Sequence, residues 1–352
     1  MARARRPSIP FTVVVGPTGA GKTTLINRLL RDPAFAHTAV ILNDFGPVAL
    51  ETGLVEKAED EFIALGSGCV CCAVRGALTD GLERLLRAVD NGRVPAIGRV
   101  VIEADAAADP AAILAAIARH PYLSLRFDAD GIVAVLGGDA EAVLAARADT
   151  ARQVAMADVV ALSSIAARSV ITALNPDAAV FDAAVVAPVQ LVGHGAFDAA
   201  TGDLEAWLGP TRPDRTSALA GEAARIHAFR VSRANLIPIA ALDRFLDYLA
   251  ALQGPNLIRI RGAVATGPDE TVVVEGFGGF FHPPLILDPP TSDAPQPRIE
   301  TRFVVAARDL DRSIFEAYLD AFLNEARVDT PDRQALTDNP LAIAGFSARS
   351  GR

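Results

Sequence analysis

A glycine-rich segment near the start of the chain has the residue types that bind nucleotide phosphates. The apolar run Phe11–Val15 leads directly into GPTGAGKTT, and helical apolar spacing follows. Glycines let backbone N–H groups turn towards phosphate oxygens, a lysine adds positive charge, and a hydroxyl can bind Mg²⁺. These flanks make a chance glycine-rich turn the weaker interpretation. We expect a nucleoside triphosphate and Mg²⁺ to be bound by Gly16, Gly19, Gly21, Lys22, Thr23 and Thr24.

A phosphate loop of this kind needs an acid at the end of another strand to hold the Mg²⁺ water shell. Glu103 ends an apolar run and is the candidate for that acid. Asp105 follows it closely, either as a loop carboxylate or as a group that orients water. Asp109 precedes Pro110, a pairing typical of a helix N-cap, and we favour that role for it. Glu103 and Asp105 are therefore the candidate catalytic carboxylates, with Lys22.

The segment Asn43-Asp44-Phe45-Gly46 follows the second apolar run. It is a candidate switch that senses the terminal phosphate, with Asp44 as a cofactor-binding residue. A simple Asn-Asp-x-Gly turn explains the same residues equally well.

All three cysteines of the chain lie within four positions, at Cys69, Cys71 and Cys72. Thiolates favour Zn²⁺ and related ions, and three of them leave one tetrahedral position open. In an extended segment the first two share a face and Cys72 does not, so convergence requires a turn at Cys71–Cys72. A redox pair or a packed cluster of small residues are the alternatives, and metal binding is the interpretation we prefer.

A fourth ligand is not selected by the sequence. Asp44, Glu51 or a side chain of a client protein could supply it. The five histidines are scattered without metal-ligand spacing, and we expect surface or turn positions for them.

The elements that must position these residues alternate between β-rich and Ala/Leu-rich stretches. This alternation predicts βαβ units and a mainly parallel sheet, with ligands at the carboxyl ends of the strands. The fold class is thus α/β, a P-loop NTPase domain over residues 11–203. The strands are expected at Phe11–Val15, Thr38–Leu42, Arg99–Glu103, Gly131–Leu136 and Asp158–Leu162.

A smaller α+β domain is expected over residues 225–326, after a Pro- and Gly-containing linker at 204–224. Its sheet should be largely antiparallel. Residues 1–10 form a basic arm, and residues 327–352 a polar tail. The expected strands are Arg225–Val231, Leu257–Val264, Thr271–Gly276 and Thr301–Ala306, with helices at Ile239–Leu252 and Ser313–Asn324.

Composition argues against nucleic-acid binding, membrane insertion and a disulfide-stabilised fold. The formal net charge is -9, which argues against nucleic acid as a partner, since phosphate binding needs a basic face. No apolar run is long enough to span a bilayer and no export signal is evident, so we expect a cytoplasmic protein without a membrane partner. An odd number of clustered cysteines does not form a disulfide framework.

The motifs together resemble the CobW-like metallochaperone family of P-loop GTPases. The resemblance rests on GPTGAGKTTLINRLL, NDFG, GCVCC, IEADAAADP, Gln153 ahead of Ala157-Asp158, and LNPDA. It extends into the second domain through PNLIRIRGAV and RFVVAARDLDRSIFEAYLDAFL, and so covers nearly the whole chain.

The resemblance implies a function in which GTP binding is coupled to delivery of zinc or cobalt to a client metalloprotein. By position, it implies that Lys22 and Thr23 bind phosphate and Mg²⁺ and that Glu103 is the Walker B acid. It also implies that Cys69, Cys71 and Cys72 are the metal ligands.

Three positions depart from the family pattern. Ala106 replaces a glycine three residues after Glu103, and alanine resists positive φ, which impairs a switch rotation. Ser163-Ser164-Ile165-Ala166 replaces the guanine-reading Asn-Lys-x-Asp. We therefore expect GTP to be preferred over ATP by less than roughly tenfold. The usual Val-Asp-Ala after the fourth strand reads Val135 to Ala140.

Two functions of different classes follow. The first is a nucleotide-dependent metallochaperone with NTPase activity. The second is a nucleotide- and metal-binding regulatory or storage protein that does not hydrolyse nucleotide. A small-molecule phosphotransferase is disfavoured because nothing besides the P-loop predicts a substrate pocket.

Overall fold

A computed structural model describes residues 8–43, 63–64, 70–73, 78–195, 197, 203–209, 219–287 and 300–323; the strand residues at 43, 63–64 and 70–73 are described by their backbone alone. The first half of the chain forms an eight-stranded sheet in the order β3-β4-β2-β5-β1-β6-β7-β8. Its strands are parallel, apart from the antiparallel pair β3 and β4. They are β1 (Ile9–Val15), β2 (Thr38–Asn43), β3 (Ile63–Ala64), β4 (Val70–Ala73), β5 (Arg99–Ala104), β6 (Phe127–Leu136), β7 (Val159–Leu162) and β8 (Ala179–Asp182).

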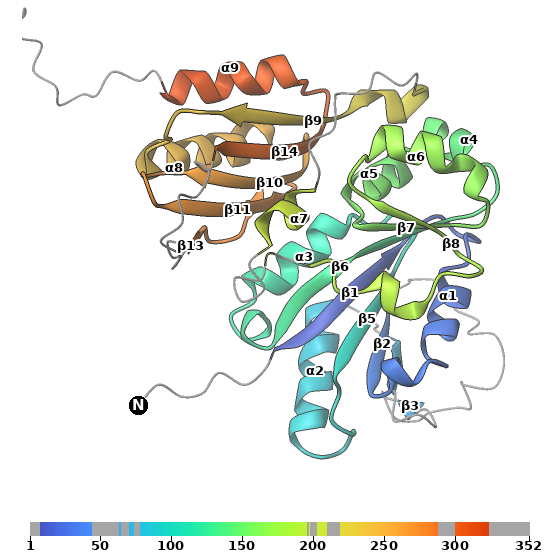
Figure 1. Ribbon diagram of the computed structural model, residues 1–352. Helices are drawn as coiled ribbons and strands as arrows, with labels where there is room; N and C mark the ends of the chain where they lie inside the picture. The colour runs from blue at the N-terminus through green and yellow to red at the C-terminus, as the bar shows by residue number, and fades with distance from the viewer. Residues whose placement is uncertain are drawn as a thin grey trace, which may run out of the picture.

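Helices cover both faces of this sheet (Figure 1). Alternate residues of β1 point to opposite faces of the sheet. Val13 and Val15 lie in the hydrophobic core that also contains residues of α2, α3 and α5. Val14 lies in the core on the other face, with residues of α1. Strands buried on both faces read as continuous apolar runs. The helices of this half are α1 (Lys22–Leu29), α2 (Leu78–Asp90), α3 (Pro110–Arg119), α4 (Ala140–Ala146), α5 (Ala148–Met156) and α6 (Arg168–Leu174).

The C-terminal domain is built on a separate antiparallel sheet in the order β12-β11-β10-β14-β9, with β13 beside β11. Phe245 and Phe315 pack α8 and α9 against one face of it. Its elements are β9 (Ile226–Arg233), α8 (Ile239–Tyr248), β10 (Leu257–Ala265), β11 (Thr271–Phe277), β12 (Phe280–Phe281), β13 (Leu285–Leu287), β14 (Thr301–Arg308) and α9 (Arg312–Leu323).

The expected fold class is confirmed, as is the antiparallel second sheet. The helix expected at Ile239–Leu252 was wrong at its end, because α8 stops at Tyr248 and a π-helical turn, Leu249–Gln253, follows. The strands β3, β4 and β8 were not predicted. They are short, so their periodicity is weak.

The stretch expected to be a linker contains a short helix, α7 (Leu204–Leu208), which lies against the C-terminal sheet (Figure 1). Arg302 pairs with Glu205 of this helix, and Trp207 lies over the guanidinium of Arg261. Across the described residues, no helix is long and apolar enough to cross a membrane.

Candidate functional site

The phosphate loop connects β1 to α1 and owes its shape to glycines. Gly16, Gly19 and Gly21 all have positive φ, at 137°, 78° and 97°. A Cβ at Gly16 would lie 2.2 Å from the carbonyl oxygen of Val135 in β6. Only glycine can approach Val135 so closely at this position. Gly21, the last glycine of the loop, is the residue immediately before α1. The loop therefore directs the N-terminus of α1 towards the carboxyl edge of the sheet, where an anion is favoured.

Three polar side chains meet at this loop. The Lys22 ammonium donates to the carbonyl oxygen of Gly16 at 2.8 Å. The Thr23 hydroxyl donates to Glu103 Oε1 at 2.8 Å, so the first turn of α1 contacts the end of β5. Glu103 is 8% exposed. Two oxygen donors beside a loop of N–H groups form an arrangement that suits a hydrated Mg²⁺ on a phosphate chain.

The loop that follows Glu103 is held by hydrogen bonds of its own. Asp105 Oδ1 accepts from the amide of Ala107 at 2.7 Å, so this carboxylate turns back on its own backbone. Asp109 caps α3 by accepting from the amide of Ala111, which confirms the N-cap role. Ala106 has no positive φ in this arrangement.

Gln153 of α5 is a residue whose contact with this loop the sequence did not reveal. Its side chain is 1% exposed, and its amide nitrogen donates to the carbonyls of Ala106 at 3.1 Å and Ala108 at 2.8 Å. The available signal was its place among the residues that carry the family resemblance, where it precedes Ala157-Asp158.

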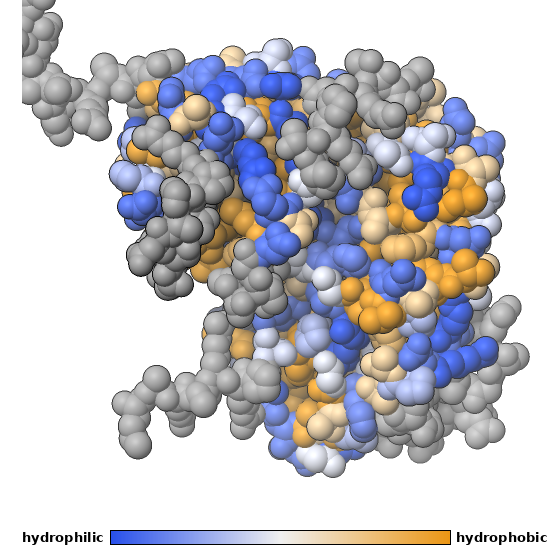
Figure 2. All heavy atoms as spheres, in the orientation of Figure 1, coloured by the Kyte–Doolittle hydropathy of each residue, from blue (hydrophilic) through white to orange (hydrophobic). Residues whose placement is uncertain are grey.

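The edge where a base-reading loop would stand is largely apolar. After β7, Ser163 donates its backbone amide to Leu136, and Ile165 is 44% exposed. After β8, Val185 and Val189 are 78% and 66% exposed, and Figure 2 shows apolar surface over this turn. The loops after β7 and β8, residues 163–167 and 183–195, contain no acid, and Oδ1 of Asp182, the last residue of β8, accepts from the amide of Ala184.

The structure gives the cysteine segment in part. Cys71 and Cys72 lie in β4, paired with Val40 and Ile41 of β2. The turn expected at Cys71–Cys72 was therefore wrong, because the backbone there is extended and belongs to the sheet. The predicted residues that lie outside the described part of the chain are Asp44, Glu51 and Cys69.

Among the described residues outside this segment, no group of three or more His, Cys, Asp or Glu side chains is close enough to hold a metal ion. His282 lies in the connection between β12 and β13 and is half-buried against Phe277 and Phe280.

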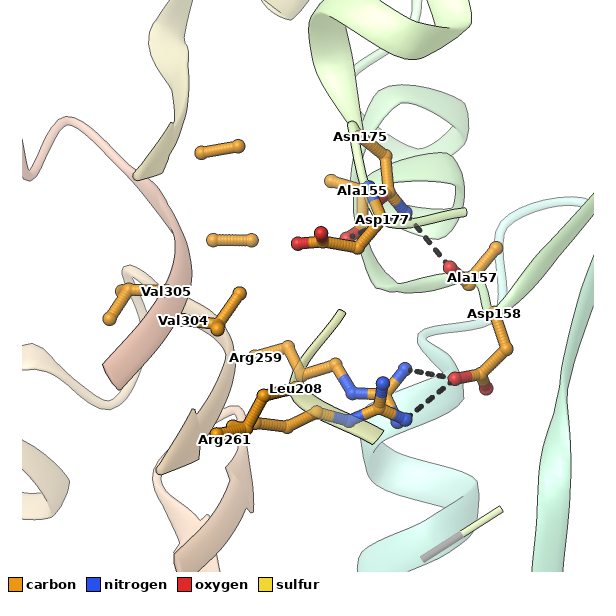
Figure 3. A pocket seen from close by; sticks show the side chains of 12 residues that line it. Ala155, Ala157, Asp158, Asn175, Asp177, Leu208, Arg259, Arg261, Val304 and Val305 are labelled. Atoms are coloured by element: carbon orange, nitrogen blue, oxygen red, sulfur yellow. Dashed lines mark hydrogen bonds and ion pairs between the residues drawn. The ribbon is translucent and has the colours of Figure 1, made fainter. Parts of the chain in front are cut away.

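A second group of buried charges joins the two domains, and the sequence did not predict it. Asp158, just before β7, accepts from Arg259 at 2.8 Å and from Arg261 at 2.7 Å (Figure 3). Both arginines come from β10 and also bond Glu275 of β11. Burial raises the pKa of Asp158, but the charges of Arg259 and Arg261 outweigh it, so the pKa is lowered overall.

Asn175, from the LNPDA motif, is a structural residue beside these charges. Its amide nitrogen donates to the carbonyls of Val154 and Ala157, at 2.8 Å each, and so closes the end of α5 (Figure 3). Its side-chain oxygen accepts from the amides of Asp177 and Ala178.

Two family models match the chain. The model described as CobW/HypB/UreG, nucleotide-binding domain, matches residues 10–171. The model described as Cobalamin synthesis protein cobW C-terminal domain matches residues 226–323. Together they cover most of the chain.

Curated relatives align with about two fifths of the chain. The zinc chaperone YjiA of Escherichia coli is 35% identical over 128 residues, which are 36% of this chain and 40% of YjiA. The zinc chaperone CobW of a Sinorhizobium species is 32% identical over 152 residues, covering 42% of this chain and 41% of the relative. The matched part thus spans about two fifths of each relative's length.

A solved structure is similar over a larger share of the chain. The Zn(II)-bound YjiA GTPase from E. coli has a TM-score of 0.73 and 23% identity, and the match covers 90% of this chain and 99% of that chain. At this identity the likeness establishes the fold.

Proposed function

The chain belongs to the CobW family, joining a CobW/HypB/UreG nucleotide-binding domain to a CobW C-terminal domain, and we propose that it is a nucleotide-dependent zinc chaperone. It binds a nucleoside triphosphate with Mg²⁺ at the loop from Gly16 to Thr24. It holds Zn²⁺ through Cys69, Cys71 and Cys72 and delivers the ion to a client metalloprotein. Convergence of all three thiols on one ion requires the extended backbone at Cys71–Cys72 to turn when the ion binds. Co²⁺ is the alternative cargo, and zinc is preferred because two similar relatives are named zinc chaperones.

The arrangement of three strands supports this proposal most strongly. In β2, Leu42 pairs with Glu103 of β5, and the adjacent Ile41 pairs with Cys72 of β4. Neighbouring strands are roughly 5 Å apart, so the backbones of the acid and the cysteine strand are separated by roughly 10 Å. A change in the position of Glu103 can therefore reach the cysteine segment through a single intervening strand.

At the nucleotide, each residue has a role that its contacts suit. Lys22, which donates to Gly16 here, would pair with the β and γ phosphate oxygens of a bound nucleotide. Thr23 and Glu103 already place two oxygens together and would hold Mg²⁺, directly or through water, and that ion would neutralise charge developing on the transferred phosphate. Asp105 is a weaker candidate for orienting water, because one of its oxygens is engaged by Ala107.

Zinc affinity measured with and without nucleotide tests the coupling. The full chain is titrated with Zn²⁺ against a competing chelator, first alone, then with Mg²⁺ and GTP or ATP. We expect the nucleotide to change the zinc dissociation constant by roughly fivefold or more. Equal affinities, together with equal transfer to an apo metalloprotein, would contradict the coupling.

Substitution of one thiol tests the ligand set. Cys71→Ser should abolish stoichiometric zinc binding, because a serine hydroxyl is a poor zinc ligand. Ser67→Ala, in the same segment, is the matched control and should retain it. Stoichiometric binding by Cys71→Ser would move the ligands to other residues.

A second candidate function has its own structural support. Gln153 fixes the carbonyls on both sides of Ala107, and Ala106 is alanine where the family pattern has glycine. A loop held in this way favours nucleotide binding without turnover, as in a regulatory or storage protein. Multiple-turnover phosphate release that disappears in both Lys22→Ala and Glu103→Gln would exclude this candidate.

A further inference from the structure

Helix α5 connects the phosphate side of the molecule to the C-terminal domain. It returns the chain from the carboxyl edge of the sheet, after β6, to the amino edge, before β7. Along this path it contacts the loop that follows Glu103, and at its end it contacts β10. The same short helix therefore touches two regions that are far apart in sequence.

The contact with the loop depends on Gln153. Its two N–H donors are directed at the carbonyls of Ala106 and Ala108. This fixes the orientation of the amide, since a flipped side chain would place its oxygen against those two carbonyl oxygens. The loop cannot move away from α5 without leaving buried donors unsatisfied, so the helix and the loop are linked.

The oxygen of the same amide has an unusual position. Gln153 Oε1 is buried and has no hydrogen-bond partner among the described residues. A buried acceptor without a donor requires a physical explanation, because most such groups are paired in native structures. The loop whose carbonyls accept from Gln153 also carries backbone N–H groups, and a rotation of that loop would supply a donor to Oε1.

The contact with the C-terminal domain depends on two arginines. Arg152, next to Gln153, donates to Asp109 at 3.0 Å and to the carbonyl of Pro255, in the turn before β10, at 3.3 Å. From the other domain, Arg259 donates to the carbonyl of Met156, the last residue of α5, at 3.0 Å. Movement of α5 is therefore transmitted to β10 at both points.

The interface beside the end of α5 is not fully filled. A cavity of about 40 Å³ is lined by Ala155, Ala157 and Asp158 on one side and by Arg259, Arg261 and Val305 on the other (Figure 3). This volume holds one or two water molecules. It leaves room for a small displacement of α5 relative to β10 without a clash.

We propose that α5 transmits the state of the phosphate site to the C-terminal domain, with Gln153 and Arg152 as the positioning residues. Nucleotide and Mg²⁺ at Thr23 and Glu103 shift the loop that follows Glu103 into a second arrangement, in which a loop N–H bonds Gln153 Oε1. Helix α5 follows, and β10 moves with it. This inference rests on the nucleotide binding proposed above and adds a defined route to the second domain.

The test measures amide hydrogen exchange of the full chain with and without Mg²⁺ and a non-hydrolysable GTP analogue. In the wild type we expect the analogue to change exchange over Leu257–Ala265 by roughly fivefold or more. Gln153→Met keeps the shape of the side chain and removes its polar atoms. It should bind the analogue within about threefold of the wild type and lose the response in β10.

A control on the same helix separates coupling from general damage. Thr150 is fully buried in α5, and its hydroxyl donates to Asp149. Thr150→Val should therefore keep the response in β10, even if it destabilises the fold. Arg152→Lys retains the pair with Asp109 but loses the planar fork, and an intermediate response is expected.

Each remaining outcome bears on the proposal. A response in β10 that survives in both Gln153→Met and Arg152→Ala would overturn it, as would a wild type that binds the analogue without any change in β10. Absence of analogue binding would overturn both this inference and the proposed function, and these failures are distinguishable because binding is measured separately.

Discussion

Two buried carboxylates in the first domain, Glu103 and Asp158, have the same exposure, 8% each, and contrasting surroundings. Glu103 lies beside a loop of backbone N–H groups and accepts from a neutral hydroxyl of Thr23. Asp158 accepts from a backbone amide and from two guanidinium groups of the other domain. The first environment suits an exchangeable cation and ligand, whereas the second already neutralises its charge. The contrast distinguishes a binding acid from a structural one.

The largest expected effect comes from removing the structural acid. Asp158→Ala leaves the guanidiniums of Arg259 and Arg261 with less compensation in a buried site, which costs about 3–5 kcal/mol. Urea unfolding should show a free energy of unfolding lowered by that amount, with a correspondingly lower midpoint. Nucleotide affinity, measured where the variant is still folded, should stay within about threefold of the wild type.

The exposed ion pair of Glu83 and Arg87 provides the control for that loss. The Arg87 side chain is 70% exposed, so Arg87→Ala should change stability by less than about 0.5 kcal/mol. An Asp158 variant as stable as this control would remove the distinction between the two carboxylates.

The next variant should lower nucleotide affinity and leave stability nearly unchanged, the opposite of Asp158→Ala. Lys22→Ala removes charged hydrogen bonds to phosphate, each contributing about 1.5–3 kcal/mol, so nucleotide affinity should fall by roughly ten- to a hundredfold. Calorimetric titration with Mg²⁺ and nucleotide measures it. The free energy of unfolding without nucleotide should change little, and Arg31→Ala, just beyond α1, should alter neither quantity. Unchanged affinity in Lys22→Ala would place the nucleotide elsewhere.

A smaller effect concerns the base. Ser163 and Ser164, after β7, stand where the family pattern has a guanine-reading motif. The neighbouring acid Asp182, at the end of β8, accepts a hydrogen bond from the amide of Ala184. We expect dissociation constants for GTP and ATP that differ by less than roughly tenfold. Competition titrations measure the ratio, and a larger preference for GTP would show that another segment reads the base.

The smallest effect should come from the titration of His282. Burial lowers its pKa, against the opposing charges of Glu275 and Asp128. The unfolded chain then binds this proton more readily than the folded one, so the stability contribution is present above pH 6.5, the ordinary histidine value, and is lost as pH falls below it. Unfolding free energies at pH 7.5 and 5.5 should differ more for the wild type than for His282→Asn. An equal difference in both proteins would assign the pH dependence to other groups.

Much of the fold could be predicted because it follows from local patterns. Continuous apolar runs such as Arg99–Glu103 identify strands that are buried on both faces. The order of strand, glycine loop and helix around Lys22 predicted both the fold and a candidate phosphate site. The short strands β3, β4 and β8 were missed because so few residues carry little periodicity, and the turn expected at Cys71–Cys72 was wrong because pairing with β2 keeps that backbone extended.

The candidate site likewise contains residues that the sequence predicted and a residue that only the tertiary structure revealed. Lys22 and Thr23 are contiguous with the loop that positions them, so the sequence alone was sufficient to propose them. Gln153 lies 50 residues beyond Glu103 and contacts its loop only because α5 packs beside α3 on one face of the sheet. No spacing rule relates the two positions.

By itself, the sequence determined the chemistry that contiguous residues can perform: a glycine-rich loop with lysine and threonine, and three clustered thiols. Tertiary structure decided which acid lies at the phosphate site and which forms structural ion pairs, because the burial and the partners of a side chain come from distant segments. Glu103 and Asp158 both adjoin apolar strands in the sequence. They differ because β10 places two arginines against one, and the phosphate loop lies against the other.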